Sequence, residues 1–466
     1  GGGKKSYLQT FVHSGINSYL CYGLLLNDKQ MMNRIILIGN GFDLAHGLPT
    51  SYKEFIEDYW TQWPQILKSC TSNICFDKLV TFSCRNKDWI WSDLISQWFG
   101  DQDSFKPLSA RKVINTLKID TENFTITRTP FFEAINNAVA TKNWVDIENE
   151  YYQLLKRIVK RETKLYESPQ SLDAELEIVK SKLVAYLSEI QKTRIIPELK
   201  NEDIRKAIYA PFKAKDISVD GRNAFDEFLT ERWEKAQNAE SLECKSLLHR
   251  FGYNWQFDTY DIQKHIESYD VSKHIERIYS GAVGIHDYFL LPSEILFLNF
   301  NYTKTADLYV PKNSYFKINH IHGELDNDKN PVIFGYGDEM DEDYKTISNL
   351  NDNSYLTNIK SIRYLETDNY RRLLRFIDSA PYQIYIMGHS CGNSDRTLLN
   401  TLFEHKNCVS IKPYYYEWID DNRVRADNYI ELVQNISRNF NDMQKMRDRV
   451  VNKSYCQPLT PVNGQP

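Results

Sequence analysis

The sequence lacks the features that mark a metal-stabilised, disulfide-bonded or membrane-spanning protein. Its eight cysteines are scattered over 466 residues without a C-x-x-C pair, which argues against a zinc ribbon and against a disulfide framework. No apolar stretch is long enough to cross a bilayer. We therefore expect a cytoplasmic protein without bound zinc and without a membrane partner.

A strong excess of charge is also absent. The formal net charge of −5 provides no general attraction to DNA or RNA, so any nucleic-acid contact would have to be local. The most basic stretch has the spacing of a solvated helix face and contains Lys156, Arg157, Lys160, Arg161 and Lys164. We expect no strong nucleic-acid partner.

The most informative feature that is present is Gly39-Asn40-Gly41-Phe42-Asp43. It follows the apolar run 34–38, which predicts a strand, and it precedes a predicted helix. Paired glycines at such a place let the backbone approach a phosphate group at the helix N-terminus. The pattern predicts a nucleotide ligand, although a plain turn has the same spacing.

The following helix is marked by a capping box of Ser51 and Glu54. The third glycine of the dehydrogenase fingerprint is replaced by Leu44, and no second strand soon afterwards ends in an acidic residue for a ribose. An ordinary dehydrogenase is therefore disfavoured.

Helical patterns dominate the next 230 or so residues, which are almost free of strand patterns. Two examples are the ranges 144–161 and 172–190. Strand patterns return at 295–300, 315–321, 332–334, 383–387 and 409–415. With 34–38 they predict an α/β fold in which a doubly wound, largely parallel sheet of about six strands carries a large helical insertion.

This pattern predicts four parts of the chain. Residues 1–33 are a leader or an expression-derived segment, because the chain begins with three glycines instead of methionine. Residues 34–60 and 291–420 form the nucleotide-binding domain, and residues 61–290 form the helical insertion. Residues 421–466 form one C-terminal helix, over 428–450, and a tail that frays from residue 458.

A polar cluster follows each predicted strand after the first, except the last. The clusters are Asn299 to Thr303, His320 to Glu324, Gly335 to Glu339 and Gly388 to Asp395. Ligands of open parallel sheets bind beyond the carboxyl ends of the strands, so these clusters and the first glycine loop should surround one crevice.

The sequence strings at these places resemble a known family. GNGFDLAHGLPTSY, NFNYT, HIHGELD, VIFGYGDE and GHSCGNSD, between about residues 34 and 415, are similar to the AbiH family of bacteriophage abortive-infection proteins. More distantly, the strings resemble the NAD-binding signature of sirtuin-like domains. The matching positions are Gly39, Gly41, Gly47, Pro49, Asn301, His322, Gly323, Gly388 and Ser390.

These resemblances imply a Rossmann-like, sirtuin-like domain and a role in phage defence. The zinc-binding cysteine pairs of deacylase sirtuins are missing, which disfavours a peptide deacylase. Thr303 stands where sirtuins carry the aspartate that helps to hold nicotinamide, and Asp43 replaces a small hydroxyl residue.

The resemblance to defence-associated sirtuin-like enzymes implies hydrolysis of NAD, as the substrate, to nicotinamide and ADP-ribose after a phage-derived trigger. His322 can act as general base near neutral pH, and Asn301 can hold a ribose hydroxyl or the attacking water. The nucleotide-binding candidates are Gly39, Asn40, Gly41, Phe42, Asp43, Gly47, Thr303, Gly388, Ser390 and Asp395. We also expect a homo-oligomer and no metal ligand.

Three other interpretations stay open. Gly388-His389-Ser390-Cys391-Gly392 matches the G-x-S-x-G elbow of hydrolases, but no histidine follows the last predicted strand. A non-catalytic nucleotide sensor would have the same crevice. A nuclease would need a metal held by the acids of one loop, which are Asp338, Glu339, Asp341, Glu342 and Asp343.

Overall fold

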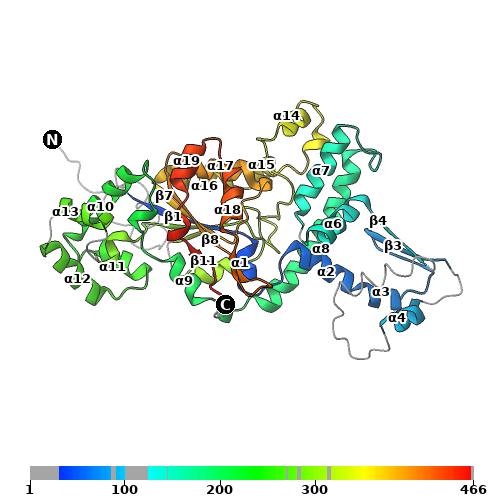
Figure 1. Cartoon of the computed structure of the whole chain (residues 1–466), viewed down its shortest axis with the longest axis horizontal. Coiled ribbons are helices and arrows are strands. Elements are labelled where there is room, and N and C mark those ends of the chain that lie inside the picture. Colours follow the sequence, from blue (N-terminus) through cyan, green and yellow to red (C-terminus); the bar gives the residue numbers. More distant parts are fainter. Residues whose placement is uncertain are drawn as a thin grey trace, which may run out of the picture.

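The structure is a computed structural model that describes residues 31–85, 91–99, 124–143, 145–268, 271–280, 285–311 and 316–462. Residues 1–30, most of the predicted leader, lie outside the described residues. At the centre of the molecule is a parallel sheet of six strands in the order β11-β8-β7-β1-β5-β6 (Figure 1). Its strands are β1 (Asn33–Ile38), β5 (Ile295–Asn299), β6 (Lys317–His320), β7 (Tyr382–Met387), β8 (Cys408–Tyr415) and β11 (Gln457–Pro458).

Strand β1 lies in the middle of this sheet and is buried on both faces. It pairs with β5 on one side and with β7 on the other, and all six of its residues are buried. Ile36 and Ile38 pack on one face against α9 (Glu202–Ile208) and α11 (Leu242–Arg250). Ile35 and Leu37 pack on the other face, where the cover includes α16 (Asn369–Ser379), α17 (Arg396–Phe403) and α18 (Tyr429–Ser437). The chain is thus an α/β protein with helices on both faces of a parallel sheet.

Five of the six predicted strands are confirmed, and one is wrong. Residues 332–334 form no strand, because the chain there passes closely against other loops: the Ile333 amide donates to the His322 carbonyl at 2.8 Å. The sixth strand is β11 instead, in the region predicted as a frayed tail. It pairs with β8 through Gln457 and Pro458, and Leu459 is buried.

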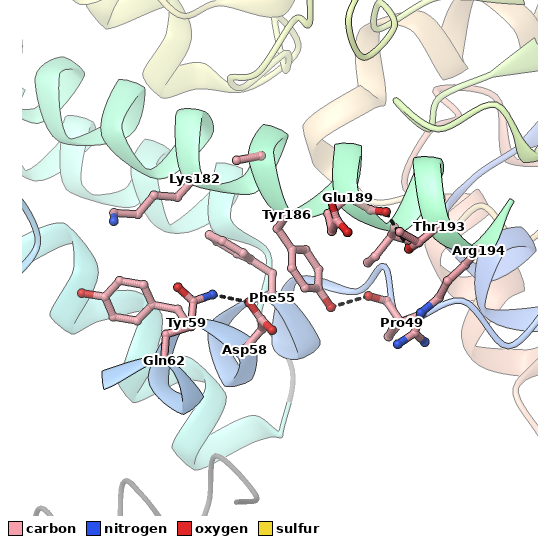
Figure 2. Close-up of a pocket in the computed structure, with 12 residues that line it drawn as sticks. Pro49, Phe55, Asp58, Tyr59, Gln62, Lys182, Tyr186, Glu189, Thr193 and Arg194 are labelled. Carbon is pink, nitrogen blue, oxygen red and sulfur yellow. Dashed lines mark hydrogen bonds between the residues drawn. The ribbon is translucent and has the colours of Figure 1, made fainter. Parts of the chain in front are cut away.

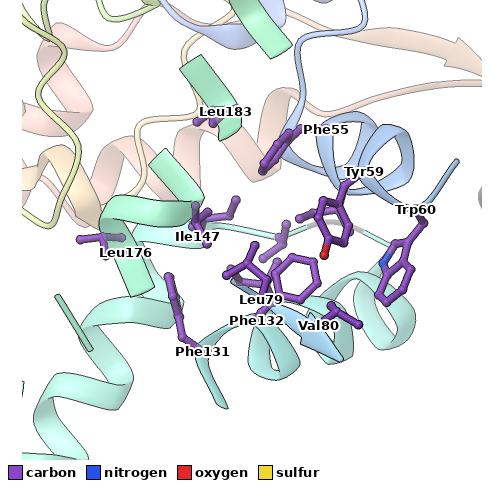
Figure 3. Close-up of a cluster of buried hydrophobic side chains, with 14 of the residues drawn as sticks. Phe55, Tyr59, Trp60, Leu79, Val80, Phe131, Phe132, Ile147, Leu176 and Leu183 are labelled. Atoms are coloured by element: carbon purple, nitrogen blue, oxygen red, sulfur yellow. The ribbon is translucent and has the colours of Figure 1, made fainter. Parts of the chain in front are cut away.

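The chain between β1 and β5 occupies both ends of the sheet (Figure 1). One end holds α2 (Tyr52–Thr61), α3 (Trp63–Lys68), α4 (Trp91–Phe99), α6 (Pro130–Lys142), α7 (Ile147–Val159) and α8 (Pro169–Arg194). These helices share an apolar core in which Phe55, Tyr59, Phe131, Phe132 and Leu176 meet (Figure 3). The capping box of Ser51 and Glu54 at the start of α2 is confirmed.

This end also contains strands, contrary to the expectation of a nearly strand-free region. β2 (Ile74–Phe76), β3 (Val80–Cys84) and β4 (Phe124–Arg128) form an antiparallel sheet. The burial of β3 alternates between buried and half-buried residues, which is the pattern of a sheet with one face on a core. These strands are too short for a convincing pattern in the sequence.

The opposite end is formed by α10 (Arg222–Ala236), α11, α12 (Trp255–Ser268) and α13 (Val271–Ser280), whereas α9 lies against the sheet (Figure 1). Short helical turns connect the remaining parts. They are η1 (Pro197–Leu199), η2 (Ala214–Asp216), η3 (Asp287–Leu290), η4 (Thr305–Tyr309), η5 (Asn353–Leu356), η6 (Tyr364–Glu366), η7 (Asn393–Asp395) and η8 (Lys453–Tyr455). Two further short helices, α14 (Glu342–Ser348) and α15 (Lys360–Arg363), follow β6.

The predicted single C-terminal helix is also wrong. A hairpin of β9 (Glu417–Ile419) and β10 (Arg425–Asp427) precedes two separate helices, α18 and α19 (Met443–Arg449). Asp442 caps α19 by accepting from the amides of Gln444 and Lys445, so a new helix starts there. Among the described residues, no helix is long and apolar enough to cross a membrane.

Candidate functional site

A crevice of about 1050 Å³ lies beyond the carboxyl ends of β1, β5, β7 and β8. Along the chain, strand order proceeds from β1 to β5 and β6 and then returns to the other side of β1 with β7. The crevice lies at this reversal, which is where ligands of open parallel sheets bind. It is lined by the predicted residues Gly39, Asn40, Gly41, Asp43, Asn301, Thr303, His322, Gly388, Ser390 and Asp395.

Two predicted residues lie elsewhere. Phe42 is fully buried in the core and packs edge-on against Tyr309. Gly47, with φ of 72°, lies in the turn after α1 (Asn40–Ala45) and does not line the crevice. Phe42 and Gly47 therefore influence the conformation of the first glycine loop and do not face the crevice.

The glycines of the first loop bring two loops together. The Gly41 amide donates to the Gly388 carbonyl at 2.8 Å. A Cβ atom on Gly39 would lie 2.5 Å from the His389 Cα, and one on Gly388 would lie 2.0 Å from the Phe42 amide nitrogen. Gly388 also has a φ of 79°, which side chains disfavour. The loops after β1 and β7 thus pack backbone to backbone and form one wall of the crevice.

Asp43 is the centre of a buried hydrogen-bond network. Thr303 donates its hydroxyl to Asp43 Oδ2 at 2.5 Å, and the Asn301 amide group donates to Asp43 Oδ1 at 3.2 Å. The same amide group donates to the Gly39 carbonyl at 2.9 Å. Burial raises the pKa of Asp43 to about 6, against the opposing effect of these hydrogen bonds. Asn301 and Thr303 therefore tie the end of β5 to the first glycine loop.

His322 lies on the wall formed by the end of β6 and is only 4% exposed. Its Nε2 is 3.2 Å from Asp395 Oδ1 and 3.1 Å from the Tyr364 hydroxyl. Burial and the positive charge of Lys360 lower the pKa of His322, and Asp395 opposes them only in part. The imidazole is therefore neutral at neutral pH.

A buried lysine lies behind His322. Lys360 is 1% exposed, and its Nζ is 2.9 Å from Asp395 Oδ1 and 3.0 Å from Glu148 Oε2. The second oxygen of Asp395 is 3.5 Å from Nε2 of His389. Five separate segments thus meet in one cluster of charged and titratable groups: the start of α7, the start of α15, η7, the loop after β6 and the loop after β7.

The charges in this cluster are unequal. Burial alone would raise the pKa of Asp395, but Lys360 and His322 outweigh it and hold the value well below the usual range. Burial raises the pKa of Glu148 to about 7, and the negative charge of Asp395 adds to the shift, whereas Lys360 opposes it only in part. Asp395 is therefore the permanent partner of Lys360, and Glu148 can hold a proton near neutral pH.

Sequence analysis missed Lys360 and Glu148. Glu148 carried a detectable signal, because with Tyr151, Tyr152 and Leu155 it has the spacing of one buried helix face. A carboxylate in such a stripe is a candidate for a buried polar contact. Lys360 begins the short helix α15, whose sequence is too short for a periodic pattern, and nothing in its surroundings along the chain distinguishes it.

The hydrolase elbow is not supported by its geometry. Ser390 is exposed at the crevice, whereas Cys391 is buried and has the positive φ of 55°. The neighbouring His389 accepts the Cys391 amide on Nδ1 at 3.0 Å and faces Asp395 with Nε2. Both ring nitrogens of the nearest histidine are thus directed at groups other than the Ser390 hydroxyl.

The acidic loop forms salt bridges with the predicted basic helix face. Lys156 Nζ is 3.4 Å from Asp343, and Lys160 Nζ is 3.0 Å from the same carboxylate. Asp341 caps α14 by accepting the Asp343 amide. Among the described residues, no group of three or more histidines, cysteines or acids is arranged to hold a metal ion.

A second pocket lies between α2 and α8 (Figure 2). Tyr186 crosses it and donates its hydroxyl to the Pro49 carbonyl at 2.6 Å. Phe55, Tyr59, Lys182 and Arg194 also line it (Figure 2). None of the predicted site residues lies in this pocket.

Comparisons with known proteins identify the family. Residues 35–416 match the family described as bacteriophage abortive infection AbiH. No curated protein and no solved structure matches the chain. The matched residues include β5, β6, β7 and β8, most of β1, and all the crevice-lining residues named above. The chain therefore belongs to the AbiH family, which gives it a role in abortive-infection defence against bacteriophages.

Proposed function

We propose that the protein hydrolyses NAD to nicotinamide and ADP-ribose within the crevice when infection triggers it. The observation that carries the proposal is the position of Asn301 and His322 in one crevice at the strand-order reversal. Numbered along the chain, the sheet order is 3-2-1-4-5-6, which is the order of Rossmann dinucleotide-binding sheets. The resemblance to sirtuin-like sequences adds NAD as the dinucleotide.

The chemistry needs few protein groups. The bond between ribose C1′ and the nicotinamide nitrogen breaks, and its electron pair leaves with nicotinamide, which becomes neutral. The ribose develops oxocarbenium character, as in glycoside cleavage, and the oxygen of a water molecule forms the new bond to C1′. That water loses one proton to a base, so the products are nicotinamide, ADP-ribose and a proton.

His322 is the base in this proposal. A general base must be unprotonated at the working pH, which for an imidazole means neutral, and it must be within reach of the water. Burial and Lys360 keep the imidazole neutral. Because Nε2 faces Asp395 and Tyr364, proton acceptance falls to Nδ1. Asp395 then stabilises the imidazolium that forms.

Asn301 positions the ribose. Its amide nitrogen is already bonded to Gly39 and Asp43, so the side chain is held in one orientation. The amide oxygen of a side chain fixed in this way can accept a hydrogen bond from a ribose hydroxyl. Asp43 and Thr303 contribute by fixing Asn301 and the loop, and Asp43 is a further acceptor at the crevice wall.

The test is nicotinamide release by the purified protein, with and without extract of phage-infected cells. Wild type should release nicotinamide and ADP-ribose in equal amounts. His322→Ala should lower the rate by about 10²- to 10⁴-fold, the usual range for loss of a general base, while binding NAD with similar affinity. His265→Ala is the matched control, because that residue lies on α12 and does not line the crevice. Absence of release under both conditions would reject hydrolysis.

A nucleotide sensor is the second candidate, and one observation favours it. The amide hydrogens of Asn301 and the Nε2 atom of His322 are already used within the protein, as in a site built to bind rather than to turn over its ligand. A sensor predicts saturable NAD binding without release in wild type. It also predicts that Asn301→Ala weakens binding, whereas an enzyme predicts that the same change mainly slows turnover.

A further inference from the structure

The buried ammonium group of Lys360 contacts neither the ribose-binding side chain Asn301 nor the base His322 directly, and its nearest partners are Asp395 and Glu148. Its side chain is buried, at 1% exposure. Lys360 and His322 contact the same carboxylate, that of Asp395, which lies between them. A buried charge is expensive unless it is paired, so such a group persists where its charge serves the site or where its partners cannot do without it.

Helix α7 holds this lysine in place. Glu148, in the first turn of α7, contacts Lys360 with Oε2 and accepts the Gly335 amide at 3.0 Å on Oε1. Four residues further along α7, Tyr152 stacks on Tyr336 with ring centroids 3.9 Å apart. The helix is thus fixed against the loop that follows β6, and its carboxylate reaches the floor of the crevice.

Lys360 and Asp395 act on His322 in opposite directions. The groups that face the imidazole are Asp395, the Tyr364 hydroxyl and, at longer range, Lys360 and His389. Asp395 alone would favour the protonated imidazolium, which is useless as a base. Lys360 draws on the same oxygen atom, Oδ1, that faces His322. The lysine therefore reduces the pull of the carboxylate while leaving its orienting contact intact.

We propose that Lys360, anchored by Glu148 of helix α7, is a positioning residue that keeps His322 neutral and oriented for its work in the crevice. The inference rests on the proposed function for its purpose, but its physical content is a coupling between two named side chains. It also gives α7, which lies between β1 and β5 in the sequence, a direct part in the site.

The test is an NMR titration of the histidines in the full chain labelled at the imidazole. His322 is assigned by the signal that disappears in His322→Asn. In Lys360→Met the pKa of His322 should rise by about one unit or more, because Asp395 is then unopposed. Lys360→Arg keeps the charge and should hold the pKa within about half a unit of wild type.

The matched control is Lys412→Met, which removes a second buried lysine that has a carboxylate partner, on strand β8. It should leave the His322 titration unchanged. Asp395→Asn provides a test of opposite sign, in which the pKa of His322 falls, and it serves if Lys360→Met does not fold. An unchanged His322 titration in Lys360→Met and in Asp395→Asn, or equal shifts in Lys360→Met and Lys412→Met, would overturn the inference.

This titration requires no turnover, so the two proposals fail separately. If His322 responds as expected and nicotinamide release is absent, the coupling holds and hydrolysis is rejected. If release is present and the titration does not respond, hydrolysis holds and the role of Lys360 is rejected. Where both hold, the acid limb of the rate profile should move to higher pH in Lys360→Met, by the same shift as the His322 pKa.

Discussion

Among the residues that the structure describes, two lysines are buried against carboxylates, and their surroundings differ. Lys412 lies on β8 with its Nζ 2.7 Å from Asp216, and the two side chains are 2% and 0% exposed. Lys360 is as deeply buried but contacts two carboxylates, Glu148 and Asp395. Glu148 and Asp395 line the crevice, whereas Asp216 does not.

The difference separates structure from function. A lysine with one carboxylate in a closed core has a single stable arrangement of charge, and removing either partner leaves the other stranded. A lysine between two carboxylates, with two histidines nearby, leaves the cluster with more than one possible arrangement of protons. Such groups are more common at functional sites than in cores.

The largest effect expected is on stability, at the closed pair. Lys412→Met should lower the free energy of unfolding by roughly 3–5 kcal/mol, because Asp216 is left buried without its partner. Lys360→Met should cost less, because Glu148 can take up a proton. Urea unfolding of the two variants measures the difference. An equal or greater loss for Lys360→Met would remove the proposed distinction between the two lysines.

Asp43 extends the comparison to a buried carboxylate that accepts hydrogen bonds from a hydroxyl and an amide group, those of Thr303 and Asn301. Its pKa is raised from 3.8 to about 6, so the native state binds a proton more tightly than the unfolded state does. The resulting stabilisation is present below pH 3.8 and is lost as the pH rises through 6. It amounts to about 3 kcal/mol at most.

Unfolding free energies of wild type and Asp43→Asn, measured between pH 4 and 8, test this. The difference between the two proteins should change by up to that amount over this range, in the direction that favours the variant at the higher pH. Asp58→Asn, on helix α2, is the control substitution. A difference that stays constant with pH would contradict the raised pKa of Asp43.

Two glycines test the wall of the crevice. Gly388 and Gly47 both have positive φ, at 79° and 72°. A Cβ on Gly47 would have no atom within 4 Å, whereas one on Gly388 would meet the backbone of Phe42. Gly47→Ala should therefore cost only the backbone penalty, about 1–2 kcal/mol, and Gly388→Ala should cost more. Equal losses in thermal unfolding would mean that the loops can separate freely.

The smallest effect expected concerns the charge of the ligand. Among the described residues that line the crevice, Lys53 is the one lysine and no arginine is present, whereas Asp43, Asp146, Glu148, Asp395 and Glu431 are acidic. A 2′-phosphate on the ribose would lack the arginine that NADP sites use. Titration calorimetry should show NADP binding about tenfold more weakly than NAD, and tighter binding of NADP would contradict this interpretation of the crevice.

Features of the fold and site that depend on local residue patterns could be predicted, whereas those that depend on contacts between distant residues could not. Strands such as β1 and β7 carry apolar runs that are legible in the sequence, and the polar clusters after them correctly indicated a shared edge. The edge strand β11 has only two residues, and its position is decided by β8 alone, so no local pattern reveals it. Lys360 meets Glu148 across 212 positions of sequence, and single-sequence patterns do not report such pairs.

The most direct test of the account compares nicotinamide release by two double variants at pH 7. Lys360→Met with Glu148→Gln removes the charges behind His322, and Lys412→Met with Asp216→Leu replaces the closed pair by apolar side chains. Since Asp395 would then hold His322 in its protonated form, the account predicts at least a tenfold loss of release in the first variant and wild-type release in the second. Equal release by both variants, or no release by wild type, would contradict it.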